Sequence, residues 1–178
     1  MAKALIISTN SGVETDEILK TGKLLAEAGV ETTFAAEEKG EIKTLVLDEK
    51  PGESGEATAT LAEVSADDYD VLVVPGGTLN ADNLRMNSDA VALVQAFTQQ
   101  KKVVAGICHA GWLFINAHIV DGVKMTSIPN IRTDLGNAGA EWEDSEVVVD
   151  DSKGYTVVTS RNPGDIEAFS AKIAELAK

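Results

Sequence analysis

Short runs of aliphatic residues alternate along this chain with longer segments whose apolar residues recur at helical spacing. The run Ala4–Ser8 is rich in Leu and Ile, which is typical of a strand buried on both faces. Such alternation implies a parallel sheet covered by helices on both faces, so the sequence predicts a doubly wound α/β fold. Strands are expected at Ala4–Ser8, Val30–Ala36, Asp70–Val74, Lys102–Ile107, Val123–Thr126, Val147–Val149 and Tyr155–Ser160.

Helices are predicted between these strands. Gly29 stands where a left-handed C-cap is wanted, and Ser88 is expected to cap the helix that follows it. The polar, threonine-rich segment 37–65 is expected to form short strands or a hairpin beside the main sheet. The helices are expected at Thr15–Ala28, Ser88–Gln100, Cys108–Ala117 and Asn130–Ala138, and after Pro163 in the last part of the chain.

The length and charge of the chain limit its partners. At 178 residues, a single domain spanning 1–178 is expected. The 15 Lys and Arg against 29 Asp and Glu give a net charge of −14. A field of that sign repels phosphate backbones and anionic headgroups, so neither nucleic acid nor a membrane surface is an expected partner.

The start of the chain and its single cysteine bear on location. The apolar run after Met1 is too short for a signal peptide, and one cysteine cannot form an internal disulfide. A cytoplasmic location is therefore expected. No dinucleotide fingerprint or Walker motif occurs, and Cys108, His109 and His118 lack metal-ligand spacing. We expect neither a cofactor nor a metal.

The segment Gly106-Ile107-Cys108-His109-Ala110-Gly111 is the strongest local signal for chemistry. Small residues flank Cys108 between a predicted strand and a predicted helix, as in the nucleophile elbow of hydrolases. A thiol at a helix N-terminus is expected to have a lowered pKa. The alternative is that Cys108 is a small buried apolar residue, which describes most free cysteines.

Pro75-Gly76-Gly77 ends another predicted strand. The N–H groups of Gly76 and Gly77 could turn into the cleft as oxyanion donors, although this tripeptide is also an ordinary turn. Glu14 is ambiguous on local grounds, since an acidic residue at a helix start is usually a solvated partner of the helix dipole. His118 is expected to be structural.

Four ordered segments resemble the PfpI-type intracellular protease/amidase family of the ThiJ superfamily, which includes the Parkinson-disease-associated deglycase. They are Asp68–Gly77, Gly106–Trp112, Ile131–Trp142 and Thr159–Asp165. The resemblance covers nearly the whole chain and implies a flavodoxin-like sandwich. Gly111 stands where many members have proline, and Ile128 where they often have an aromatic residue or histidine.

The resemblance also implies roles for particular residues. Cys108 would be the nucleophile, and Glu14 would be the glutamate beside its sulfur if Gly12 is an inserted residue. His109 would carry protons, and the N–H groups of Gly77 and His109 would form the oxyanion hole. Because a charged carboxylate opposes a thiolate, we expect this glutamate to keep its proton. Family members form dimers or hexamers, so a homodimer or homohexamer is expected.

Two classes of function follow. The first is a cysteine-dependent enzyme acting on carbonyl compounds: a deglycase or glyoxalase acting on glyoxal, methylglyoxal or their adducts, or an intracellular peptidase or amidase. The second is a redox-sensing or chaperone-like stress protein, in which Cys108 is oxidised without turnover.

Overall fold

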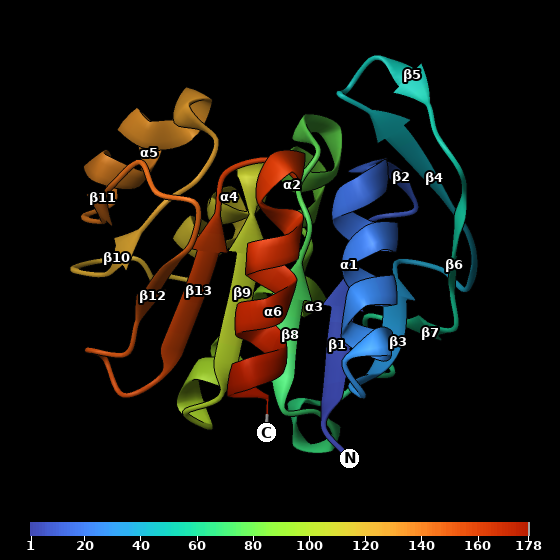
Figure 1. The fold of residues 1–178 in the computed structure, drawn as a ribbon, viewed down its shortest axis with the longest axis horizontal. Coiled ribbons are helices and arrows are strands. Elements are labelled where there is room, and N and C mark those ends of the chain that lie inside the picture. Colours follow the sequence, from blue (N-terminus) through green and yellow to red (C-terminus); the bar gives the residue numbers. More distant parts are fainter. Residues whose placement is uncertain (178) are drawn as a thin grey trace.

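The computed structural model describes residues 1–177 and is organised around a seven-stranded sheet (Figure 1). Neighbouring strands of this sheet run parallel, except for the last two strands at one edge, which are antiparallel to each other. In order across the sheet, the strands are β12 (Val148–Asp150), β13 (Thr156–Ser160), β9 (Val103–Ile107), β8 (Val71–Val74), β1 (Lys3–Ile7), β3 (Glu31–Ala36) and β7 (Ala59–Thr60). The central order β3-β1-β8-β9-β13 is flavodoxin-like, and it confirms the predicted fold.

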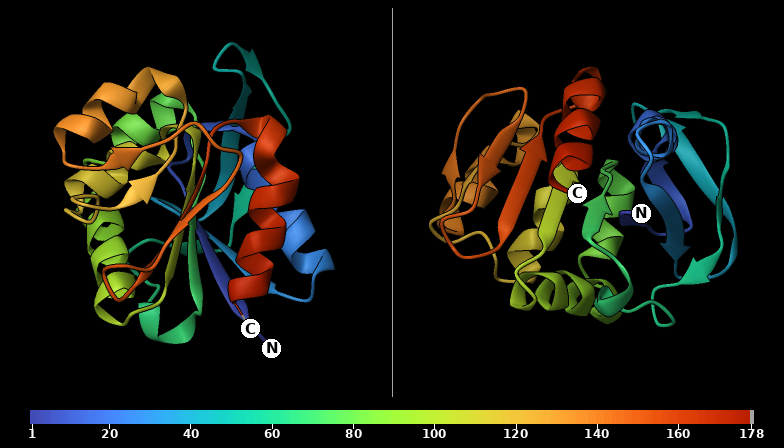
Figure 2. Two further views of the ribbon diagram at one scale, coloured as in Figure 1. Left: turned by 60° about the vertical axis from the view of Figure 1, so that its left-hand side comes forward. Right: turned by 60° about the horizontal axis from the view of Figure 1, so that its bottom comes forward.

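Helices cover both faces of the sheet, as Figures 1 and 2 show. On one face lie α1 (Thr15–Glu27) and α6 (Ile166–Leu176). On the other lie α2 (Thr78–Leu84), α3 (Ser88–Gln99), α4 (Gly111–Asn116) and α5 (Arg132–Asn137). Alternate residues of each buried strand contribute to the two apolar cores, for example Leu5 to one and Ile6 to the other. Single 3-10 turns occupy Ala66–Asp68, Cys108–Ala110, Pro129–Ile131 and Pro163–Asp165.

The segment 37–65 forms short strands beside the main sheet, as predicted. They are β4 (Gly40–Val46), β5 (Lys50–Pro51) and β6 (Gly55–Ala57), followed by the edge strand β7. Strand β4 also pairs with β2 (Ser11–Glu14), which the sequence did not predict. The β4–β5 turn projects past the carboxyl end of the main sheet (Figure 1). Its residues Leu47 and Asp48 both have positive φ, which favours a tight hairpin.

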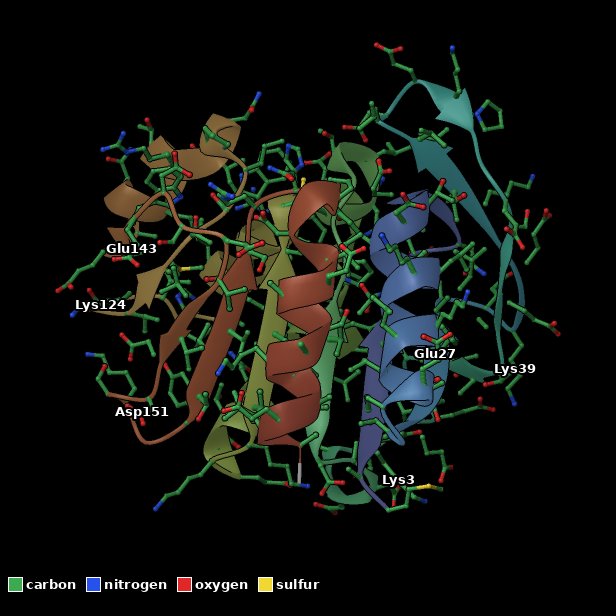
Figure 3. The ribbon with its side chains drawn as sticks, in the orientation of Figure 1. Lys3, Glu27, Lys39, Lys124, Glu143 and Asp151 are labelled. Carbon is green, nitrogen blue, oxygen red and sulfur yellow. The ribbon has the colours of Figure 1, made fainter. Side chains whose placement is uncertain are left out.

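A small parallel pair lies beyond the other edge of the sheet. It joins β10 (Lys124–Met125), which was predicted, to β11 (Glu141–Trp142), which was not. Figure 3 shows the charged side chains of Lys124, Glu143 and Asp151 along this margin, and those of Lys3, Glu27 and Lys39 around the opposite side of the molecule. Within residues 1–177, no helix is long and apolar enough to cross a membrane.

The N-cap of α3 is Asn87, and the predicted cap at Ser88 is wrong by one residue. The Asn87 side chain accepts hydrogen bonds from the N–H groups of Asp89 and Ala90, both at 3.0 Å. Ser88 is exposed and already helical. Asparagine and serine satisfy free N–H groups equally well, so the sequence could not separate the two positions.

Replacing Asn87 with alanine should lower the free energy of unfolding by about 1 kcal/mol, because two N–H groups lose their acceptor. Ser88→Ala is the matched control and should change the unfolding free energy little. Urea unfolding of both variants measures the difference. An equal or larger loss in Ser88→Ala would contradict this assignment of the cap.

Candidate active site

Cys108 occupies a sharp turn at the carboxyl end of β9. Its φ is +61°, and the chain passes directly from it into the 3-10 turn Cys108–Ala110 and then α4. A side chain on Gly106 would collide with Phe114, with atoms only 2.6 Å away. The strand, the turn and the small neighbour together give the elbow expected from the sequence, and Cys108 is 7% exposed.

Glu17, on the first turns of α1, is the carboxylate next to this thiol. Its side chain is fully buried, and its Oε2 accepts the Gly76 N–H at 2.6 Å. The carboxyl and the Cys108 thiol are close enough to act on each other's pKa, and Oε1 has no hydrogen-bond partner among the described residues. Burial raises the pKa of Glu17 to about 8, so this carboxyl keeps its proton at neutral pH.

Glu14, which the resemblance placed beside the sulfur, has a different position. It precedes α1 by one residue, and its Oε2 accepts the N–H of Leu47 at 2.8 Å. The carboxylate therefore anchors the β4–β5 turn rather than contacting Cys108. Glu17 is three positions after Glu14, which is nearly one helical turn, so the two side chains lie at different levels along the α1 axis. Burial also raises the pKa of Glu14.

His109 turns its ring toward its neighbour's sulfur. Its Nδ1 lies 3.2 Å from Cys108 Sγ, and its Nε2 lies 3.3 Å from Thr78 Oγ1. The Trp112 ring packs beside it, with 5.3 Å between the ring centroids. Burial lowers the pKa of His109, which favours the neutral imidazole, although the charge of Asp48 acts in the opposite direction.

Backbone N–H groups complete the surroundings of the sulfur. Those of Gly77 and His109 lie close enough to Cys108 to lower the pKa of its thiol, whereas the Gly76 N–H donates to Glu17. Of the three expected oxyanion donors, Gly76 is therefore not available. The two remaining N–H groups lower the thiol pKa, but burial raises it by more, and Glu17 would raise it further once ionised. The predicted lowering of the Cys108 pKa is therefore wrong. Because two neighbouring negative charges repel each other, ionisation of either Cys108 or Glu17 disfavours ionisation of the other.

A pocket of about 350 Å³ adjoins His109. It is lined by Leu45, Asp48, Thr78, Leu79, Asp82 and Trp112. Thr78 and Trp112 also contact the His109 ring, so the pocket offers a small molecule an approach to this side of the site.

His118 lies outside the site on an exposed turn. Among residues 1–177, no three His, Cys, Asp or Glu side chains are grouped to hold a metal ion.

The fold and this cysteine site define a class of protein. The sequence matches the DJ-1/PfpI family over residues 2–176, and the chain belongs to that family. It is similar to Deglycase PfpI of Pyrococcus furiosus, with 38% identity over 176 residues and 99% of each chain covered.

Two other relatives have different names. General stress protein 18 of Bacillus subtilis is 38% identical over 174 residues, covering 96% of this chain and 95% of the relative. Protein/nucleic acid deglycase 2 of Escherichia coli is 33% identical over 180 residues, covering 99% and 98%. Among solved structures, Drosophila melanogaster DJ-1beta aligns with a TM-score of 0.86 at 29% identity, covering 99% of this chain and 90% of that one.

Proposed function

We propose that this protein is a cysteine-dependent enzyme that acts on reactive dicarbonyls such as glyoxal and methylglyoxal, or on their early adducts with amines. One observation carries the proposal. The free thiol of Cys108 is surrounded by a fully buried carboxyl that keeps its proton, an imidazole and two N–H donors. This is the equipment required to add a thiol to a carbonyl and to hold the resulting oxyanion.

In the proposed step, Cys108 Sγ bonds to the aldehyde carbon while the thiol proton passes to His109 Nδ1. The carbonyl π electrons move to oxygen, and the N–H groups of Gly77 and His109 stabilise that oxyanion. Glu17 donates its proton to the oxyanion or to the departing thiolate, and it recovers a proton later in the cycle. The charge changes little within the buried site, because each negative charge that forms meets a proton donor.

The names of the relatives support this class of reaction. Three of the similar proteins described above carry the words deglycase or stress protein, and another, YraA of Bacillus subtilis, is a putative cysteine protease at 34% identity over 178 residues. A deglycase and a peptidase would share the thiol nucleophile and differ in the substrate. The small pocket beside His109 favours a small carbonyl compound over a folded peptide chain.

The purified protein should convert methylglyoxal to lactate catalytically, and Cys108→Ser should abolish that turnover. Losing the nucleophile typically removes several orders of magnitude of rate, on the order of 10³ or more. The measurement is lactate produced per enzyme over time. His118→Gln, at an exposed histidine away from the site, is the matched control and should keep full activity. Lactate formation that persists in Cys108→Ser would refute the proposal.

The second candidate is a redox-sensing protein, and the same donors favour it. A sulfinate on Cys108 would accept hydrogen bonds from the N–H groups of Gly77 and His109 and from protonated Glu17. Exposure to hydrogen peroxide would then give one oxidised cysteine per chain, detected by mass spectrometry. Stoichiometric oxidation in a protein without dicarbonyl turnover would favour this candidate over the enzyme.

A further inference from the structure

We propose that Asp48, on the β4–β5 turn, acts through Thr78 as a positioning residue that fixes the protonation pattern of the His109 ring, so that Nδ1 can accept the thiol proton. The inference deepens the proposed function. The role that it gives His109 in turnover rests on that function. Asp48 lies 61 positions away from His109 in the chain, and no motif in the sequence connects them.

The chain of contacts begins with two hydrogen bonds to the Asp48 carboxylate. Oδ1 accepts the Thr78 N–H at 2.9 Å, and Oδ2 accepts the Thr78 hydroxyl at 2.6 Å. A carboxylate can only accept, so the single hydroxyl proton of Thr78 is committed to Asp48. The backbone bond holds Thr78 in place while the side-chain bond orients its hydroxyl.

The committed hydroxyl determines what His109 can do. Thr78 Oγ1 can then only accept from His109 Nε2, which lies 3.3 Å away. A neutral imidazole with its proton on Nε2 carries a lone pair on Nδ1. That nitrogen lies 3.2 Å from Cys108 Sγ and is placed to take the thiol proton. The direction of each hydrogen bond thus follows from the carboxylate at the far end.

Asp48 also stabilises the imidazolium that forms when His109 takes the proton. Its negative charge raises the pKa of His109, opposing the effect of burial. The other groups facing the ring are the Cys108 thiol on Nδ1 and the Trp112 ring beside it, and Asp82 lines the same pocket. Among these, Asp48 is the group linked to Nε2 through the Thr78 hydroxyl.

The hairpin that carries Asp48 is held at the site by the residue that sequence reasoning placed elsewhere. Glu14 accepts the N–H of Leu47, and the positive φ values of Leu47 and Asp48 shape the turn. The Val46 carbonyl closes the turn by accepting the Glu49 N–H at 3.1 Å. Asp48 is therefore presented by a fixed turn rather than by a free loop.

The tautomer of His109 can be read directly by nitrogen-15 NMR, since the chain has 2 histidines and His118→Gln leaves one. The test compares Asp48→Asn, Thr78→Val and Thr78→Ser in that background without substrate. In the parent, the signals should show a proton on Nε2. Thr78→Val should give a mixture of tautomers, and Thr78→Ser should restore the parent pattern. Asp48→Asn should move the proton toward Nδ1, because an amide can donate to Thr78 Oγ1 and free its hydroxyl to donate to Nε2.

The second readout is the rate at which iodoacetamide alkylates Cys108 at neutral pH. We expect this rate to fall about tenfold in Asp48→Asn and Thr78→Val and to stay near that of the parent in Thr78→Ser. Glu49→Gln, which removes a charge from the same exposed turn, is the matched control and should change neither readout. The inference would be overturned if Asp48→Asn and Thr78→Val both kept the parent tautomer of His109. It would also be overturned if Thr78→Ser did not show the parent tautomer. If the parent protein shows the expected His109 tautomer but does not turn over dicarbonyls, the proposed function is refuted and the role of Asp48 in positioning His109 stands.

Discussion

Glu17→Gln should be more stable than the parent protein at pH 8 while having lost most of its turnover. The unfolded chain ionises this carboxyl near pH 4.5, whereas the folded chain keeps the proton up to about pH 8. Between these values the folded state binds more protons, so the free energy of unfolding falls with rising pH by about 1.4 kcal/mol per unit. Over the whole window the loss attributable to Glu17 is at most about 5 kcal/mol. Glutamine has no proton to lose, so this decline is absent from the variant.

Urea unfolding at pH 5 and pH 8 measures the effect, with both proteins compared at each pH so that other carboxylates cancel. Turnover should fall about 100-fold or more, because glutamine cannot give up and recover a proton. Glu14→Gln is the matched control: its carboxyl binds the Leu47 N–H and makes no contact with Cys108. It should keep most of the turnover and show a smaller stability change. A Glu17→Gln protein that loses stability with pH as steeply as the parent would show that Glu17 is already ionised at neutral pH.

Gly76→Ala should damage both the site and the fold. A Cβ at this position would lie 2.7 Å from Glu17 Oε2, 2.8 Å from Cys108 Cβ and 2.9 Å from the His109 nitrogen. All three contacts are too short, and two of them involve groups that cannot swing aside. We expect a stability loss of about 1–3 kcal/mol from overpacking. A shift of these groups by a fraction of an ångström should lower turnover by about 100-fold.

The matched control for this change is Gly136→Ala in α5, where a Cβ meets nothing within 4 Å. Adding a methyl group inside a helix there should raise stability by about 0.5–1 kcal/mol and leave turnover unchanged. Dicarbonyl turnover and urea unfolding are measured on both variants. Parent-like turnover in Gly76→Ala would show that the close approach of the backbone to Glu17 and Cys108 is not needed for the chemistry.

Most of the sheet could be predicted because its strands are short aliphatic runs that need no distant partner to be recognised. Helix α2 could not, since Thr78–Leu84 lacks an apolar stripe. Tertiary bonds hold it instead: fully buried Asn80 accepts the N–H of Thr9 at 2.8 Å and the Thr9 hydroxyl at 3.0 Å. Such bonds join segments far apart in the chain and leave no local pattern.

The partner of Cys108 was misplaced, although the sequence contained a signal for it. Glu17, Thr21 and Leu25 follow one another at a spacing of four, and all three are buried on α1. A glutamate in line with the buried stripe of a predicted helix is unusual and therefore a candidate for function. The resemblance pointed to Glu14 because it treated Gly12 as an insertion. The contact of His109 with Thr78, and that of Thr78 with Asp48, had no comparable signal, because they depend on how a hairpin packs over the end of the sheet.

The site as described requires Glu17 to be protonated at neutral pH and to lie beside the Cys108 thiol. Infrared difference spectroscopy of the carboxylic acid C=O stretch tests it most directly, using parent minus Glu17→Gln spectra at pH 7. We expect a protonated carboxyl band that is present in the parent and in Glu14→Gln, absent from Glu17→Gln, and shifted in frequency in Cys108→Ser because the sulfur is gone. If the pH 7 difference spectrum shows an ionised Glu17, or if its band does not move in Cys108→Ser, the protonated Glu17 carboxyl is not paired with the Cys108 thiol.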